Sequence, residues 1–142
     1  MRAFGLALTI LLLPATASAA DIAAACYTSC EASTNSNPEY KACLARAADA
    51  ADAKLNDGYK ALQVAIRKAA KEMGQSPDIQ LSSLTGAQKQ WIAYRDENCT
   101  FEDELAFGGT AIGGNYSACL CALSLEREQD FARIRKHLLF GE

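Results

Sequence analysis

Histidine, tryptophan and proline are scarce in this chain of 142 residues, which has one histidine, one tryptophan and three prolines. A single histidine cannot supply the usual Cys/His ligand set of a zinc site, although a site built from cysteines alone stays open. Lysine and arginine form no cluster, and the formal net charge is -3. That charge pattern argues against a nucleic-acid partner, which needs a basic surface. We expect neither a metal nor a cofactor.

Long apolar runs are absent from all but the start of the chain, so no transmembrane segment is expected. At the start, Arg2 precedes an apolar run over 4–13, and Pro14 and small residues follow it. This order is typical of a cleaved secretory signal peptide, which we predict over 1–20. A buried N-terminal helix or a lipid anchor at Cys26 is the alternative. Cleavage would release a soluble chain of net charge -4 into the periplasm or the medium, because it removes Arg2 and no acidic residue.

Apolar residues recur every three or four positions in the rest of the chain, as they do on one face of a helix. The clearest stripe predicts a helix over 37–73, with Asn37 as N-cap, Pro38 in the first turn and Gly74 at the end. The stripe consists of Tyr40, Leu44, Ala47, Ala51, Leu55, Tyr59, Leu62, Ile66, Ala69 and Met73.

Two shorter helices are predicted on either side of this one. The first, over 21–32, carries two cysteines one turn apart. The second is expected to begin near Thr85, because Gln88 lies three residues later and completes a capping box, and to end near Glu104.

The last helix is predicted from Asn115, its N-cap, to about Leu139. Alanine is abundant, and β-branched residues never form an alternating run as they would in a strand. The predicted fold is therefore all-α: a single small helical bundle of about four helices over 21–142. The apolar stripe of this last helix consists of Tyr116, Cys119, Leu120, Leu123, Arg127, Phe131, Ile134 and Leu138.

Two arginines lie on stripes that should face the core. Gln88, Trp91 and Arg95 share one face of the third predicted helix, and Arg127 lies at the centre of the last stripe. A buried arginine is costly unless it is paired or hydrogen-bonded. The pattern indicates either a polar site in a cleft or, as the favoured interpretation, an internal network that ties helices together.

The run over 87–99, Ala-Gln-Lys-Gln-Trp-Ile-Ala-Tyr-Arg-Asp-Glu-Asn-Cys, resembles the signature of the LprI-type lysozyme inhibitor domain family. In that family a Gly-Gly loop, a second cysteine and a Thr-x-x-Arg follow. Here these are Gly108-Gly109, Cys119 and Ser124 with Arg127, so serine replaces threonine. The resemblance covers nearly the whole predicted mature chain. The residues that match the family's motif are Gln88, Trp91, Arg95, Asp96 and Arg127.

The resemblance also implies a disulfide pairing for the six cysteines, which could otherwise pair in fifteen ways. Two pairs follow the family pattern, and the third joins the two cysteines that the pattern lacks. A redox role for the Cys-x-Cys segment is the alternative, although it lacks the usual two-residue spacing. The implied pairs are Cys99–Cys119, Cys30–Cys43 and Cys26–Cys121.

The resemblance implies an exported binding protein that blocks a lysozyme, not an enzyme. No nucleophile pattern accompanies the lone histidine, His137. An envelope interaction module with a different protein partner is the alternative. We expect partner contact in the glycine-rich loop, where glycine lets backbone enter a narrow groove. The loop consists of Phe107, Gly108, Gly109, Thr110, Ala111, Ile112, Gly113, Gly114 and Asn115.

Overall fold

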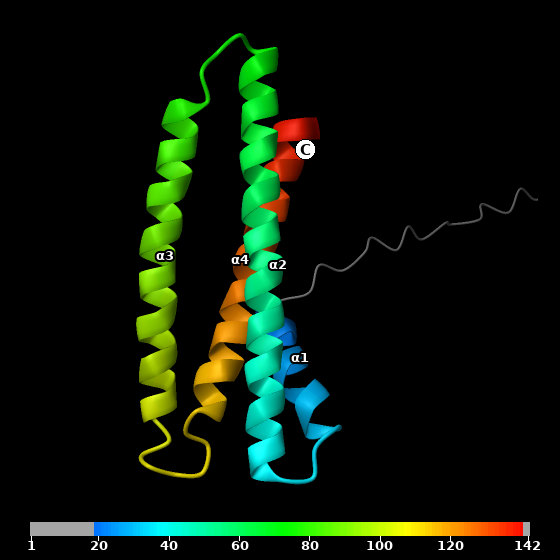
Figure 1. Cartoon of the computed structure of the whole chain (residues 1–142), viewed down its shortest axis with the longest axis vertical. Coiled ribbons are helices and arrows are strands. Elements are labelled where there is room, and N and C mark those ends of the chain that lie inside the picture. Colours follow the sequence, from blue (N-terminus) through cyan, green and yellow to red (C-terminus); the bar gives the residue numbers. More distant parts are fainter. Residues whose placement is uncertain (1–18, 141–142) are drawn as a thin grey trace, which may run out of the picture.

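The computed structural model describes residues 19–140, so the predicted signal peptide lies outside the described residues except for its last two positions. Four helices make up this part of the chain, and none of its residues lies in a strand. The predicted all-α bundle of about four helices is confirmed (Figure 1). The helices are α1 (Ala19–Glu31), α2 (Asn37–Glu72), α3 (Asp78–Glu104) and α4 (Gly114–Phe140).

The two helices α2 and α4 lie along each other and form the centre of the bundle (Figure 1). Small side chains such as Ala48, Ala51 and Ala122 are buried where the two helices meet, and small residues allow a close approach. Further along, Leu62 of α2 packs with Phe131 of α4, each 1% exposed. This α2–α4 seam is the main hydrophobic core.

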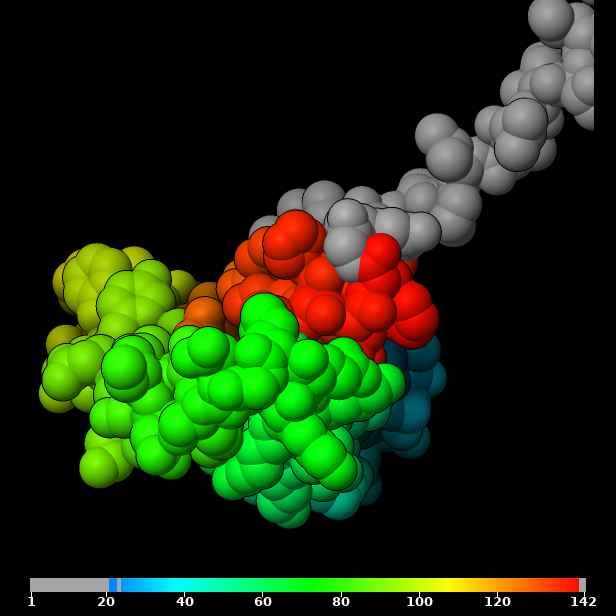
Figure 2. Space-filling model, turned by 90° about the horizontal axis from the view of Figure 1, so that it is seen from above, coloured from blue at the N-terminus to red at the C-terminus, as the bar shows by residue number. Residues whose placement is uncertain are grey.

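The helices α1 and α3 lie on opposite flanks of the central pair, as the two views agree (Figures 1 and 2). In α1, Ile22, Cys26 and Cys30 are buried. In the 27-residue α3, Gln88 and Cys99 are the buried residues, so most of this helix has an exposed or half-exposed surface. The third helix covers one side of the core, against which its partly buried Leu84 and Trp91 pack, and buries little else.

The ends of α2 differ slightly from the prediction. Its N-cap is Ser36, whose Oγ accepts a hydrogen bond from the N–H of Glu39, so Asn37 is the first helical residue and not the cap. At the other end, Gly74 adopts a φ of 66°. Its N–H donates to Lys71, and that of Gln75 donates to Ala70, which completes the predicted glycine stop.

The start of α3 was predicted wrongly. The helix begins at Asp78, and Thr85 lies inside it instead of capping it. The hydroxyl of Thr85 donates to the carbonyl of Leu81, 2.8 Å away, and lies 3.0 Å from the hydroxyl of Tyr59 on α2. A threonine that bonds to a carbonyl four residues earlier fits a helix interior, so the capping-box spacing was coincidental.

The start of α4 was also predicted wrongly, because Asn115 is not its cap. The helix begins at Gly114, and the Asp103 carboxylate of α3 accepts hydrogen bonds from the N–H groups of Gly113 and Tyr116, at 2.7 and 3.1 Å. A cap from another helix leaves no local signature. The predicted stripe was too narrow as well: α4 contacts all three other helices, and Ala118, Cys121, Ala122 and Ser124 are buried outside it.

Three disulfides connect the helices, and all six cysteines are paired. One joins α1 to α4, one joins α1 to the first turns of α2, and one joins the end of α3 to the start of α4. These are the pairs implied by the family resemblance. They are Cys26–Cys121, Cys30–Cys43 and Cys99–Cys119.

Candidate functional site

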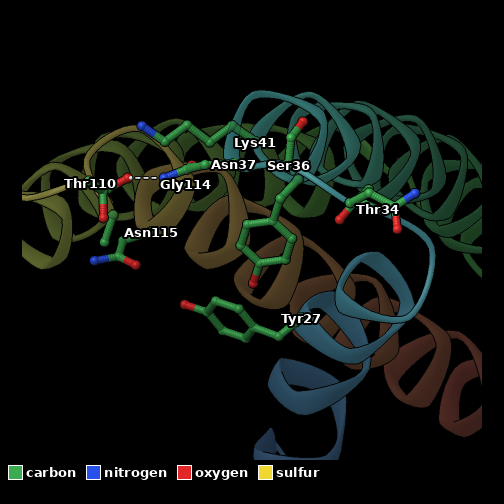
Figure 3. Close-up of a pocket in the computed structure, with 11 residues that line it drawn as sticks. Tyr27, Thr34, Ser36, Asn37, Lys41, Thr110, Gly114 and Asn115 are labelled. Atoms are coloured by element: carbon green, nitrogen blue, oxygen red, sulfur yellow. Dashed lines mark hydrogen bonds between the residues drawn. The ribbon is translucent and has the colours of Figure 1, made fainter.

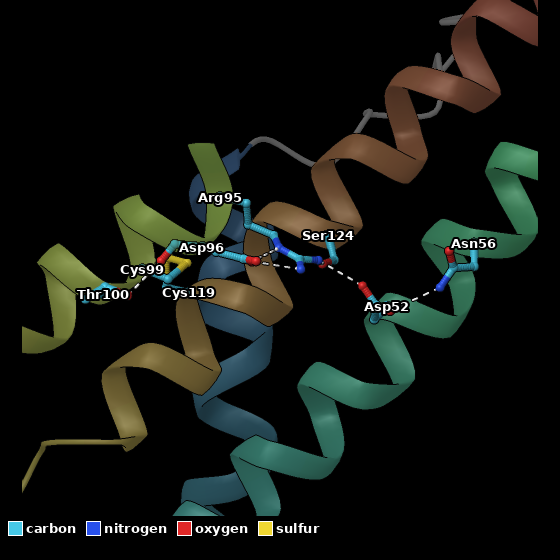
Figure 4. Close-up of polar contacts among 8 residues, drawn as sticks. All are labelled: Asp52, Asn56, Arg95, Asp96, Cys99, Thr100, Cys119 and Ser124. Carbon is cyan, nitrogen blue, oxygen red and sulfur yellow. Dashed lines mark hydrogen bonds and ion pairs between the residues drawn. A yellow bond between two sulfur atoms is a disulfide. The ribbon is translucent and has the colours of Figure 1, made fainter. Parts of the chain in front are cut away.

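Arg95 of α3 lies at the centre of a polar network that reaches both central helices (Figure 4). Its guanidinium donates to Asp52 Oδ1 of α2 at 2.8 Å and to Ser124 Oγ of α4 at 3.1 Å. Its Nε and Nη2 both contact Asp96 Oδ1, at 3.0 and 2.9 Å. The side chain is only 12% exposed, so these partners replace most of its water.

These partners keep the guanidinium of Arg95 positively charged. Burial lowers the pKa of Arg95, but the hydrogen bonds to Asp52 and Asp96 outweigh it and raise the pKa above its ordinary value. Asp52 is itself oriented by the amide of Asn56, 3.0 Å from its second oxygen. The arginine therefore stays cationic and fixed in place.

Trp91 lies between the two arginines. The guanidinium carbon of Arg95 is 5.4 Å from the ring centroid, and that of Arg127 is 5.7 Å from it. Arg127 also lies 4.8 Å from the ring of Phe131 and donates through Nε to Gln88 Oε1 at 3.3 Å. Both arginines thus pack on aromatic faces, which attract cations.

The structure brings all five family-motif residues into one network between α3 and α4. Arg127 is 18% exposed and Gln88 is buried. Every buried side-chain nitrogen or oxygen among the described residues has a hydrogen-bond partner. The arrangement is that of an internal network that fastens α3, with no unsatisfied group pointing at a ligand.

The glycine-rich loop after α3 presents a different surface. Phe107 is 90% exposed and adopts a φ of 48°, a left-handed conformation that is uncommon for residues other than glycine. Gly108 and Gly113, with φ of 83° and 81°, turn the chain at the two ends of the segment 109–112. The base of the loop is held by the Asp103 cap and by the Cys99–Cys119 disulfide.

Two residues that sequence reasoning missed extend this surface. Phe101 and Leu105, near the end of α3, are 57% and 51% exposed, and Ile112 of the loop is 41% exposed. Their signal was present in the sequence: Phe101 and Leu105 are four residues apart, so they share a helix face. We call Phe101, Leu105, Phe107 and Ile112 the loop-end apolar group.

The chain segment that carries the loop-end apolar group has acidic residues but no basic ones, while Lys41 of α2 lies beside the inner part of the loop. No lysine, arginine or histidine lies between Arg95 and Arg127, whereas Glu102 and Glu104 are exposed beside the group.

In the part of the chain that the structure describes, no group of three or more histidine, cysteine or acidic side chains is placed to hold a metal ion.

The inner half of the loop lines a pocket of about 440 Å³ that was not predicted (Figure 3). Thr110 and Asn115 lie on one side of it, and the turn between α1 and α2 supplies the other. The carbonyl of Thr110 accepts a hydrogen bond from the amide of Asn37 at 3.2 Å, which links the loop to α2. The predicted loop residues therefore divide between two surfaces, the loop-end apolar group and this pocket.

The fold and these surfaces define a disulfide-linked four-helix protein with an exposed apolar loop at one end. The chain belongs to the lysozyme inhibitor LprI family, whose sequence model matches residues 28–131. The matched range includes α2, α3, the network around Arg95 and the whole glycine-rich loop.

One curated relative is an uncharacterized protein of Rhizobium meliloti (strain 1021). It is 34% identical over 91 residues, which cover 60% of this chain and 63% of the relative. The chain thus spans less than two thirds of the length of that protein. No solved structure matches the chain.

Proposed function

We propose that this protein is an exported, non-enzymatic inhibitor that inserts its glycine-rich loop into the substrate cleft of a muramidase. The observation that carries the proposal is the 90% exposure of Phe107 on a loop whose base is fixed. A large aromatic side chain on a constrained loop is a suitable anchor, since little entropy is lost when it binds.

Contact with the cleft would involve both side chains and backbone. The loop-end apolar group offers Phe107 and Ile112 for burial in the cleft, with Phe101 and Leu105 at its edge. Gly108 and Gly109 follow Phe107, and Gly113 and Gly114 follow Ile112, which allows close backbone approach. Backbone N–H groups donate to carboxylates, so they would satisfy the catalytic acids of the enzyme without a basic side chain.

Charge supports the encounter. Lysozymes of the C type are cationic, and this chain has a net charge of -3. The exposed Glu102 and Glu104 place negative charge at the loop itself. Opposite charges steer two proteins together, and salt screens this attraction. We therefore expect inhibition to weaken as ionic strength rises.

Export is supported by two features. Three disulfides form and persist in oxidising compartments outside the cytoplasm. The sequence start has the pattern of a signal peptide. Among the described residues, no helix is long and apolar enough to cross a membrane.

The test is hydrolysis of bacterial cell walls by a C-type lysozyme at low salt, with and without the purified protein. We expect inhibition by the native chain and a rise of about tenfold or more in the half-inhibitory concentration for Phe107→Ala, as for an interface hot spot. Phe140→Ala is the matched control, because Phe140 is 72% exposed at the other end of the bundle.

Equal inhibition by Phe107→Ala and Phe140→Ala would place the contact elsewhere. The absence of inhibition by the native chain across several lysozyme classes, at tens of micromolar protein, would overturn the proposal. In that case a stoichiometric partner recovered from the periplasm would identify an envelope interaction module instead.

A further inference from the structure

We propose that the pocket between the glycine-rich loop and the α1–α2 turn binds a neutral saccharide that carries N-acetyl groups. The pocket has a volume of about 440 Å³, within the range of about 300–1,000 Å³ that is usual for small-molecule sites. It is separate from the loop-end apolar group, so this inference goes beyond the proposed inhibition.

The lining of the pocket is rich in hydrogen-bonding groups, and Lys41 is the one charged residue among those that line it. Side-chain amides and hydroxyls come from three separate segments, which the Asn37–Thr110 hydrogen bond and the Cys30–Cys43 disulfide hold together. Such groups both donate and accept, as a sugar with many hydroxyls requires. The residues that would contact the ligand are Tyr27, Asn35, Tyr40, Lys41, Thr110 and Asn115.

Two tyrosines give the pocket an aromatic wall. Tyr27 of α1 and Tyr40 of α2 are half-buried and pack against the core formed by Cys30, Leu44 and Ala118. Aromatic faces carry partial negative charge, which suits the C–H groups on one face of a pyranose ring. The tyrosine hydroxyls are available for hydrogen bonds to a ligand. Figure 3 shows the hydroxyl of Tyr27 pointing toward the space between α1 and the loop.

The tyrosine hydroxyls stay protonated donors. Burial raises the pKa of Tyr27, and the charges of neighbouring groups, Glu102 among them, raise it further. Burial and the nearby carboxylate of Glu31 raise the pKa of Tyr40 in the same way. These phenols are therefore neutral at any physiological pH.

The surrounding charges favour a neutral ligand. Lys41 lines the pocket and disfavours a cationic amine, such as a deacetylated amino sugar. Glu31 and Glu102 act on the tyrosines, and the Glu39 carboxylate accepts from the N–H of Asn35 at 3.1 Å, so an anionic ligand is disfavoured too. An acetamido group keeps the polar N–H and carbonyl of an amino sugar but removes its charge.

The test is a titration of the full mature protein, followed by amide chemical shifts in NMR. The probes are chitotriose, which is neutral and N-acetylated, maltotriose, which has no acetamido group, and the glucosamine trimer, which is cationic. A peptidoglycan disaccharide, which is N-acetylated but carries the carboxylate of muramic acid, is the anionic probe and distinguishes chitin-type glycans from cell-wall strands as the source. We expect chitotriose to shift the amides of Thr34, Asn35, Thr110 and Asn115, and the anionic disaccharide to bind more weakly.

Variants locate the site. Tyr27→Phe and Tyr40→Phe keep the ring and its packing but lose the hydroxyl, so each should weaken binding about fivefold. Lys41→Met should weaken binding by a similar factor, whereas Lys54→Met, an exposed lysine further along α2, should leave it unchanged.

The outcomes separate this proposal from the inhibitor proposal. Phe107→Ala should retain saccharide binding even where it abolishes lysozyme inhibition. Equal binding of maltotriose, tighter binding of the cationic trimer, or no shift with any probe at millimolar concentration would overturn the assignment. Shifts confined to residues outside the pocket would overturn it as well.

Discussion

The α2–α4 seam and the attachment of α3 hold the same molecule together by different physical means. The seam is apolar, with alanines and leucines buried at 9% exposure or less. The third helix buries only Gln88 and Cys99. Besides the partial packing of Leu84 and Trp91 on the core, it is held by an arginine network, two cation–π contacts with Trp91 and one disulfide. Apolar burial stabilises without regard to direction, whereas ion pairs and hydrogen bonds require a particular geometry.

The difference bears on the loop between α3 and α4. Because the polar contacts of α3 are directional, they fix where this helix ends and therefore where the loop begins. Asp103 at the end of α3 then caps α4 directly. We infer that the seam provides stability and that the α3 attachment provides the position of the loop.

The largest expected effect comes from a cavity in the seam. Leu62→Ala removes a side chain that is 1% exposed and should lower the free energy of unfolding by about 3 kcal/mol. Ile92→Ala on α3, where the side chain is 40% exposed, should change it by less than about 0.5 kcal/mol. Denaturant unfolding measures both. Equal losses would show that α3 contributes as much apolar stabilisation as the seam.

A smaller effect is expected when the arginine network is broken. Arg95→Met leaves Asp52 and Asp96 without their cation and should lower the free energy of unfolding by about 2 kcal/mol. Hydrogen exchange should become faster in α3 and in the loop, with little change in α2. Arg133→Met is the control, because Arg133 is 72% exposed. Uniform acceleration in all helices would contradict the separate roles of the two regions.

The smallest expected effect concerns one hydrogen bond between α2 and α3. Thr85→Val removes the contact with Tyr59 and should lower the free energy of unfolding by about 1 kcal/mol. Thr100→Val is a matched control, because Thr100 makes the same bond to a carbonyl four residues earlier but is exposed. If the two variants lose equal stability in denaturant, the Tyr59 contact contributes nothing.

Local patterns in the sequence predicted the helices but not all of their ends. The apolar stripe of α2 and the end of this helix at Gly74 depend on local sequence, so the sequence alone predicted them. The capping-box spacing at Thr85 was misleading because Tyr59, far away in the sequence, supplies the competing partner. The Asp103 cap of α4 was invisible for the same reason, since the carboxylate and the helix start meet only in the fold.

The candidate surfaces were predictable to different degrees. The glycines after Phe107 marked an irregular loop, and the motif arginines on core-facing stripes indicated a paired network. The pocket could not be predicted, because Tyr27, Lys41 and Asn115 come from three segments that only the folded chain brings together. The exposure of Phe101 and Leu105 also depends on how α3 is oriented on α4.

The Cys99–Cys119 disulfide closes the chain into a ring that contains the whole loop. Exposed glycine-rich loops are preferred sites of cleavage by proteases, which an exported protein meets. A cut after Phe107 would give two polypeptides, yet both would stay covalently joined through this bond and through Cys26–Cys121. Helices α3 and α4 would keep their places, and a single cut would leave one molecule.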